Sequence, residues 1–166
     1  MPKHALLSAS GAHRWLECPP SARLEESFED RPSDSAKEGT LAHAIAEAKV
    51  RNMLIDPLPK RSFNKILKDF TNNSMYQKEM DALTDEYAEY IREIMLSYTQ
   101  KPYIAVEVKL NLSTYIPEGL GTADCIIISG NDLHIIDLKY GKNVPVSAED
   151  NPQLKLYALG AVGEYE

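Results

Sequence analysis

Charged side chains interrupt two apolar segments in the C-terminal third of the chain. Asp137 follows the apolar run LHII, and Lys139 lies two residues further along, on the same face of an extended chain. Asp124 begins the apolar part of the segment TADCIIIS, and the turn sequence SGND joins the two segments as a hairpin. A buried carboxylate is costly unless it is paired or holds a cation. The sequence therefore predicts a site where Asp124 approaches Asp137.

Two neighbouring carboxylates favour a bound divalent cation, because the cation removes their mutual repulsion. Carboxylate oxygens suit Mg²⁺ or Mn²⁺. Such an ion activates water and stabilises charge on a phosphoryl group, and Lys139 could orient the nucleophile or neutralise developing charge. The alternative is a buried ion pair between Asp137 and Lys139 that serves only to pack the sheet.

The segments before residue 100 are predicted to be mainly helical. Two short helices within residues 10–28 are broken at residues 18–20, because consecutive prolines cannot continue a helix. Ser35 is the predicted N-cap of the next helix, with Glu38 three residues later as a capping box. A basic stretch over residues 60–68 and a long amphipathic helix over about residues 77–98 follow.

From residue 103 the apolar pattern alternates, which predicts strands. Five apolar residues are expected on one face of the first strand: Ile104, Val106, Val108, Leu110 and Leu112. Glu107 and Lys109 fall on the other face. The next two strands are nearly continuous in apolar character, which is typical of central strands covered on both faces. A last helix begins at Asn151 as N-cap, with Pro152 at its first position. The fold class expected is α/β (α+β), with a central mixed sheet flanked by helices and an N-terminal helical region.

Length and charge narrow the classes of protein. The 166 residues predict a single domain over residues 1–166, with residues 1–100 mainly helical and residues 101–166 forming the sheet and last helix. No apolar run approaches a membrane span, and a cytoplasmic protein without a membrane partner is expected. The net charge of −7 argues against coating nucleic acid by bulk electrostatics, but it leaves local, metal-dependent binding open. Two cysteines and no CxxC exclude a zinc ribbon.

Four motifs occur in an order that resembles a known superfamily. They are GTLAH at residues 39–43, GTAD at 121–124, IDLK at 136–139 and QLKLY at 153–157. Together they resemble the PD-(D/E)XK nuclease superfamily, in particular the RecB-like exonuclease branch that includes the CRISPR-adaptation exonucleases. The opening SGAHRWLECPPSARLEE is similar to an uncharacterised phage-associated family of that branch. The resemblance implies a restriction-endonuclease-like core and a bacterial or phage-encoded protein.

The resemblance also implies roles for individual residues. The metal ligands would be His43, Asp124, Asp137 and the backbone carbonyl of Leu138. Lys139 would be the catalytic lysine, acting with Asp124 and Asp137. Gln153 and Tyr157 lie one helical turn apart, and the resemblance makes them residues that line the site and contact the DNA. Glu107 is a further candidate, and a surface salt bridge with Lys109 explains it about as well.

Cysteine usage and length depart from the resembled pattern. In many relatives an N-terminal cysteine, here matched by Cys18, joins three C-terminal cysteines around a [4Fe–4S] cluster. Cys125 is the only other cysteine, so a cluster is expected only if further cysteines lie beyond this chain. The last core strand of the resembled fold is also missing after residue 166. The sequence therefore predicts the N-terminal part of a longer protein, or a shortened version.

These features predict a Mg²⁺- or Mn²⁺-dependent DNA exonuclease that hydrolyses phosphodiester bonds. The alternative is a catalytically inactive module with the nuclease fold that binds DNA or another protein. A third interpretation is a structural domain in which Asp137 and Lys139 form a buried ion pair.

Overall fold

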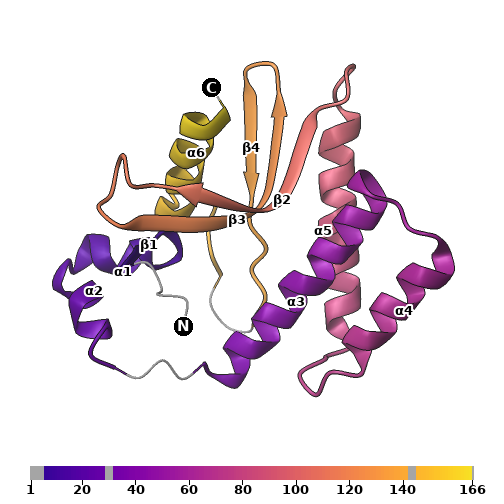
Figure 1. Cartoon of the computed structure of the whole chain (residues 1–166), viewed down its shortest axis with the longest axis horizontal. Helices are drawn as coiled ribbons and strands as arrows, with labels where there is room; N and C mark the ends of the chain where they lie inside the picture. The colour runs from indigo at the N-terminus through magenta and orange to yellow at the C-terminus, as the bar shows by residue number, and fades with distance from the viewer. Residues whose placement is uncertain (1–5, 29–31, 142–144, 166) are drawn as a thin grey trace.

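The computed structural model describes residues 6–28, 32–141 and 145–165, which form a mixed four-stranded sheet flanked by helices (Figure 1). The strands are β1 (Leu7–Ser8), β2 (Tyr103–Asn111), β3 (Gly119–Ser129) and β4 (Asp132–Ile136). The helices are α1 (Ala12–Glu17), α2 (Pro20–Glu25), α3 (Asp34–Val50), α4 (Lys60–Thr71), α5 (Glu79–Leu96) and α6 (Pro152–Tyr165). A 3-10 turn (Ala9–Gly11) and a π-helical turn (Arg51–Ile55) extend α1 and α3. The predicted α+β class is confirmed.

Strand β3 is the centre of the sheet. It pairs antiparallel with β2 along one edge, and along its other edge it pairs antiparallel with β4 and parallel with β1. The pairing of Ser129 with Asp132 confirms the predicted hairpin, and Gly130 takes the positive φ of 58° that a tight turn requires. Strand β1 was not predicted, because two residues are too few to show an alternating pattern. β4 pairs with β3 alone among the described residues, so the prediction that it is a central strand is wrong.

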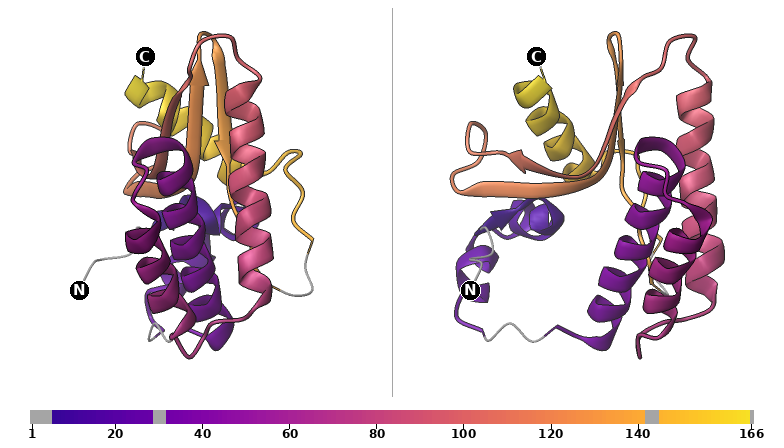
Figure 2. Two further views of the ribbon diagram at one scale, coloured as in Figure 1. Left: turned by 90° about the vertical axis from the view of Figure 1, so that its right-hand side faces the viewer. Right: turned by 45° about the vertical axis from the view of Figure 1, so that its right-hand side comes forward.

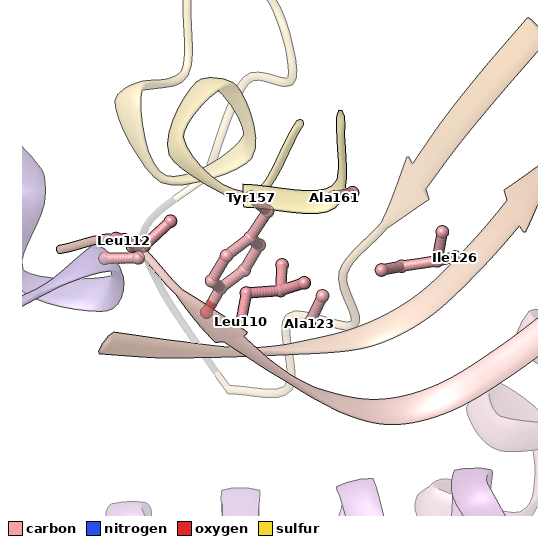
Figure 3. Close-up of a cluster of buried hydrophobic side chains, with 7 residues drawn as sticks. Leu110, Leu112, Ala123, Ile126, Tyr157 and Ala161 are labelled. Atoms are coloured by element: carbon pink, nitrogen blue, oxygen red, sulfur yellow. The ribbon is translucent and has the colours of Figure 1, made fainter. Parts of the chain in front are cut away.

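Helices cover both faces of the sheet (Figure 1, Figure 2). On one face, α6 packs over β2 and β3, and the cluster there comprises Ala9, Leu110, Leu112, Ala123, Ile126, Tyr157 and Ala161. Figure 3 shows the ring of Tyr157 extending from α6 toward the strands beside Leu110. On the other face, α3 and α5 supply a second cluster, which comprises Val50, Ala88, Ile91, Met95, Val106, Cys125 and Ile127.

Strand β2 changes the face of its apolar residues part-way along. Val106 packs in the cluster under α3 and α5, whereas Leu110 packs in the cluster under α6. The prediction that one face carries all the apolar residues of β2 is therefore wrong. The strand ladder is interrupted between the pairs Val106–Cys125 and Val108–Ala123, where Glu107 has a φ of 53°. Both strands bend sharply, as Figure 2 shows, and their helices pack on opposite sides of the bend.

Several element boundaries differ from the predicted ones. Helix α3 begins at Asp34, and the hydroxyl of Ser33 accepts a hydrogen bond from the Ala36 N–H at 3.1 Å, so Ser33 and not Ser35 is the N-cap. Strand β3 begins at Gly119, which places Asp124 in its middle. Strand β4 ends at Ile136, so Asp137 and Lys139 lie just beyond the strand and not within it.

Other local predictions are confirmed. The chain breaks between α1 and α2 at Cys18 and Pro19. The side chain of Asn151 accepts hydrogen bonds from the N–H groups of Gln153 and Leu154 at 3.0 and 3.3 Å, which caps α6 as expected. Among the described residues, none of the helices has both the length and the apolar character needed to cross a membrane.

Candidate functional site

His43 and Asp124 form the centre of the candidate site. The Nδ1 atom of His43 on α3 lies 3.1 Å from Oδ1 of Asp124 on β3. The other carboxylate oxygen of Asp124 accepts a hydrogen bond from the backbone N–H of Leu138 at 2.6 Å. The side chain of Asp124 is only 13% exposed and that of His43 is 30% exposed. Three segments distant in the sequence thus converge on one carboxylate.

Glu107 joins this pair from the neighbouring strand. One ligand atom each of His43, Glu107 and Asp124 lie within 4.8 Å of one another. The interruption of the β2–β3 ladder explains this arrangement, because Glu107 faces Asp124 across it. Among the described residues Glu107 makes no ion pair with Lys109, and its electrostatic interactions with cations are with His43 and Arg51. The salt-bridge interpretation of Glu107 is therefore wrong.

A second group of side chains surrounds Asp137. Its Oδ2 lies 2.7 Å from Nζ of Lys139, and its Oδ1 accepts a hydrogen bond from the amide of Gln153 at 2.9 Å. The same amide nitrogen donates to the Tyr157 hydroxyl at 3.0 Å, while the Gln153 carbonyl accepts from Lys139 at 2.9 Å. All three side-chain hydrogen bonds of Gln153 are thereby within the site. The structure thus brings Asp137, Lys139 and Tyr157 together, and Gln153 contacts all three.

An open cleft of about 650 Å³ connects the two groups. Its lining includes His43, Asp124, Asp137, Lys139, Gln153 and Tyr157. The N-terminal segment around Ser8 forms another part of the wall, because β1 pairs with the start of β3. Gly121 permits the ring of Tyr157 to pack closely on β3, since a Cβ atom at this position would lie 2.6 Å from Cε1 of the tyrosine.

Burial and neighbouring charges perturb the titratable groups of the site. The hydrogen bond to Asp124 raises the pKa of His43, although burial opposes the shift. Burial raises the pKa of Glu107, and the negative charge of Asp124 adds to that increase. Burial is also the main cause of the raised pKa of Asp137. Burial raises the pKa of Tyr157 to about 12, so its hydroxyl stays protonated. The carboxylates are thus held close together at an electrostatic cost.

The remaining predicted candidates lie elsewhere. Cys18 is exposed at the end of α1, and Cys125 is buried in β3 beside Asp124. The basic residues between Lys60 and Lys68 lie on α4, which packs against α3.

The comparisons with known proteins identify a family. Residues 4–166 match the family model described as "Protein of unknown function (DUF2800)". The chain belongs to this family. No solved structure matches the chain.

The DUF2800 chain also places residues at the site that the sequence did not single out. Glu47 lies one turn after His43 on α3 and lines the same small pocket as His43 and Asp124. Its spacing of four residues from His43 could have indicated this position. Lys109 lines the cleft, and its alternation with apolar neighbours in β2 was the available signal. Tyr87 also lines this small pocket, and the sequence placed it only within the amphipathic helix predicted over about residues 77–98.

The donor set of the DUF2800 chain fits a divalent cation. One imidazole nitrogen and carboxylate oxygens from two strands lie together, and these ligand types suit Mn²⁺, with carboxylates also suiting Mg²⁺. Burial is the main cause of the raised pKa of Glu107, and a cation at this point would offset the repulsion from Asp124 that adds to it. Asp137 is close enough to interact electrostatically with His43 and Asp124, so the cluster continues toward Lys139.

Proposed function

We propose that this DUF2800 chain is a Mg²⁺- or Mn²⁺-dependent deoxyribonuclease of the PD-(D/E)XK superfamily, acting as an exonuclease on DNA. The observation that carries the proposal is the convergence of His43, Asp124, Asp137 and Lys139 on one open cleft. The assignment to the RecB-like branch, and with it exonuclease action and a restriction-endonuclease-like core, rests on the order of the four sequence motifs.

Each residue of the candidate site would have a distinct role. His43, Asp124 and either Glu107 or Asp137 would hold the cation, which supplies activation of water and stabilisation of charge on the phosphate. Lys139 is 46% exposed at the cleft and carries a positive charge that can meet a phosphate oxygen or orient the attacking water. The side-chain amide of Gln153 hydrogen-bonds to both Lys139 and Asp137 and so fixes their positions relative to each other.

The test is degradation of linear DNA by the purified chain in the presence of Mn²⁺ or Mg²⁺. Wild-type protein should degrade DNA with the metal and not with EDTA, and Asp124→Ala and Lys139→Ala should each lose activity by at least about 100-fold. Asp132→Ala, at the far end of the β3–β4 hairpin, is the matched control and should retain activity. Wild-type rates in both site variants would exclude the proposal.

A second candidate function is a nuclease fold that binds DNA or a protein without cleavage. The ion pair between Asp137 and Lys139 favours it, because that contact neutralises the lysine within the site. Calorimetry separates the two candidates. A folded chain that binds no Mn²⁺ would favour the binding module, whereas stoichiometric Mn²⁺ binding that Asp124→Asn abolishes favours the nuclease.

A further inference from the structure

The hydroxyl of Tyr87 is a buried donor that the proposed chemistry does not use. Tyr87 lies on α5, and its hydroxyl oxygen is buried without a hydrogen-bond partner among the described residues. A buried hydroxyl without a partner costs free energy that a phenylalanine at the same place would not cost. Burial raises the pKa of this phenol well above its ordinary value, so the group remains a proton donor. A hydrogen-bond acceptor close to this hydroxyl is therefore expected.

A small pocket lies between Tyr87 and the candidate metal ligands. Its volume is about 10 Å³, and its lining includes Tyr87, His43, Glu107, Asp124 and Glu47. Apolar side chains such as Val50 and Val106 form the rest of the wall, and a space of this size holds at most one water molecule where polar partners are present. The phenol also interacts electrostatically with Asp124 and Glu107. A donor and several carboxylates thus share a space that fits one bridging water.

Glu107 is the ligand that most needs such support. Its backbone φ of 53° lies in the left-handed region, which is unfavourable for a residue with a Cβ atom. This conformation accompanies the interruption of the strand ladder opposite Asp124. A side chain on such a backbone keeps one orientation when its neighbours fix it, and Tyr87 is a neighbour that lines the same small pocket as Glu107.

We propose that Tyr87 is a positioning residue that holds the carboxylate of Glu107 in place for the cation through one water molecule in this pocket. The Tyr87 hydroxyl donates to the water, and the water donates to a carboxylate oxygen of Glu107. The inference rests on the proposed metal site and extends it by assigning the outer contact. Outer contacts of this kind typically change metal affinity 10- to 100-fold.

The first test compares Mn²⁺ binding by wild type and Tyr87→Phe, measured by calorimetry. Tyr87→Phe should weaken Mn²⁺ binding about 10-fold, while its melting temperature without metal stays equal to that of wild type or rises. Tyr90→Phe on the exposed face of the same helix is the matched control and should bind as wild type does. An unchanged dissociation constant in Tyr87→Phe, with wild type binding Mn²⁺, would overturn this inference alone. No binding by wild type would overturn the metal site and the inference with it.

A double-mutant cycle tests the route through Glu107. In the background of Glu107→Gln, the further change Tyr87→Phe should alter the Mn²⁺ dissociation constant less than twofold, since the contact it supports is already altered. If the effects of the two changes on Mn²⁺ binding are fully additive, Tyr87 does not act through Glu107, and the inference is overturned.

A crystal structure of the wild-type chain provides a test that needs no variant to fold. It should show an ordered water within hydrogen-bond distance of both the Tyr87 hydroxyl and a Glu107 carboxylate oxygen. A dry pocket, or a water that does not contact both the Tyr87 hydroxyl and the Glu107 carboxylate, would overturn the inference.

Discussion

Glu107 faces Asp124 across a gap in the ladder between β2 and β3. Along β2, the apolar residues up to Val106 pack under α3 and α5, and those from Val108 onward pack under α6. Both carboxylates therefore lie at the point where β2 changes its packing face. His43 on α3 reaches the same point. The bend in the sheet and the assembly of the candidate ligands are one structural feature.

Asp137→Asn should separate stability from activity. The side chain of Asp137 is only 5% exposed and burial raises its pKa, so its charge is costly without a cation. We expect the free energy of unfolding in EDTA to stay within about 1 kcal/mol of wild type or to increase, because Lys139 is half exposed and can be hydrated. DNA cleavage should fall at least about 100-fold. Urea denaturation and a cleavage assay measure the two effects, with Asp132→Asn as control. A loss of more than about 3 kcal/mol would instead support a purely structural ion pair.

Gln153→Ala should lower the turnover number for DNA about 10- to 100-fold with little change in KM. The reason is that the Gln153 amide contacts Asp137, Lys139 and Tyr157, so its loss loosens the cation-binding and catalytic groups together. Steady-state kinetics on linear DNA makes the measurement, and Gln100→Ala on the surface is the control. A raised KM with an unchanged turnover number would assign Gln153 to direct DNA contact, as the sequence resemblance implies.

Gly121→Ala should destabilise the fold by about 1–3 kcal/mol. The added Cβ would lie 2.6 Å from the ring of Tyr157 and 3.1 Å from Cβ of Ala9, so the wall of the cleft must shift. Gly39→Ala provides the contrast, because nothing lies within 4 Å of its Cβ position in the interior of α3. That change should stabilise the chain by roughly 0.5–1 kcal/mol. Chemical denaturation compares both variants, and equal effects would contradict the packing described for Gly121.

The pH dependence of stability should reveal the contact between His43 and Asp124. Since this hydrogen bond raises the pKa of His43, its contribution in EDTA is complete below about pH 6.5 and is lost as pH rises through the higher pKa of the folded state. The stability difference between wild type and His43→Gln should therefore shrink as pH rises from about 6. Exposed His13→Gln is the control. A difference independent of pH would contradict a charged His43 in this contact.

Mn²⁺ affinity should change with pH in the opposite direction. A cation binds the neutral imidazole, so protons compete with it until pH exceeds the raised pKa of His43. Calorimetry across the same pH interval measures this effect. Affinity that falls with rising pH would exclude His43 as a ligand.

The sequence predicted the fold class and the central pair of the site. Asp124 was found because a carboxylate in an apolar segment needs a partner, and His43 was found through its motif in α3. The strands after residue 103 and the N-cap at Asn151 were predicted from equally local signals. Such features depend on a few neighbouring residues, which explains why the sequence sufficed for them.

The change of packing face could not be predicted. The prediction for β2 rested on a regular alternating strand. The positive φ of Glu107 interrupts that regularity, and no glycine at this position indicated it in the sequence. The alternative interpretation of Glu107, a surface salt bridge with Lys109, followed from the same assumption. Tyr87 was missed because its hydroxyl acquires meaning only from the pocket that α3, α5 and the bent strands enclose together.

Anomalous scattering from Mn²⁺ in crystals of the wild-type chain tests the proposed metal site most directly. Wild-type crystals should show one strong peak at direct ligand distance from His43 and Asp124, with Glu107 or Asp137 completing the protein ligands, and crystals of Asp124→Asn should show no such peak. A well-ordered site without a peak at saturating Mn²⁺, or a peak that Asp124→Asn leaves unchanged, would contradict it.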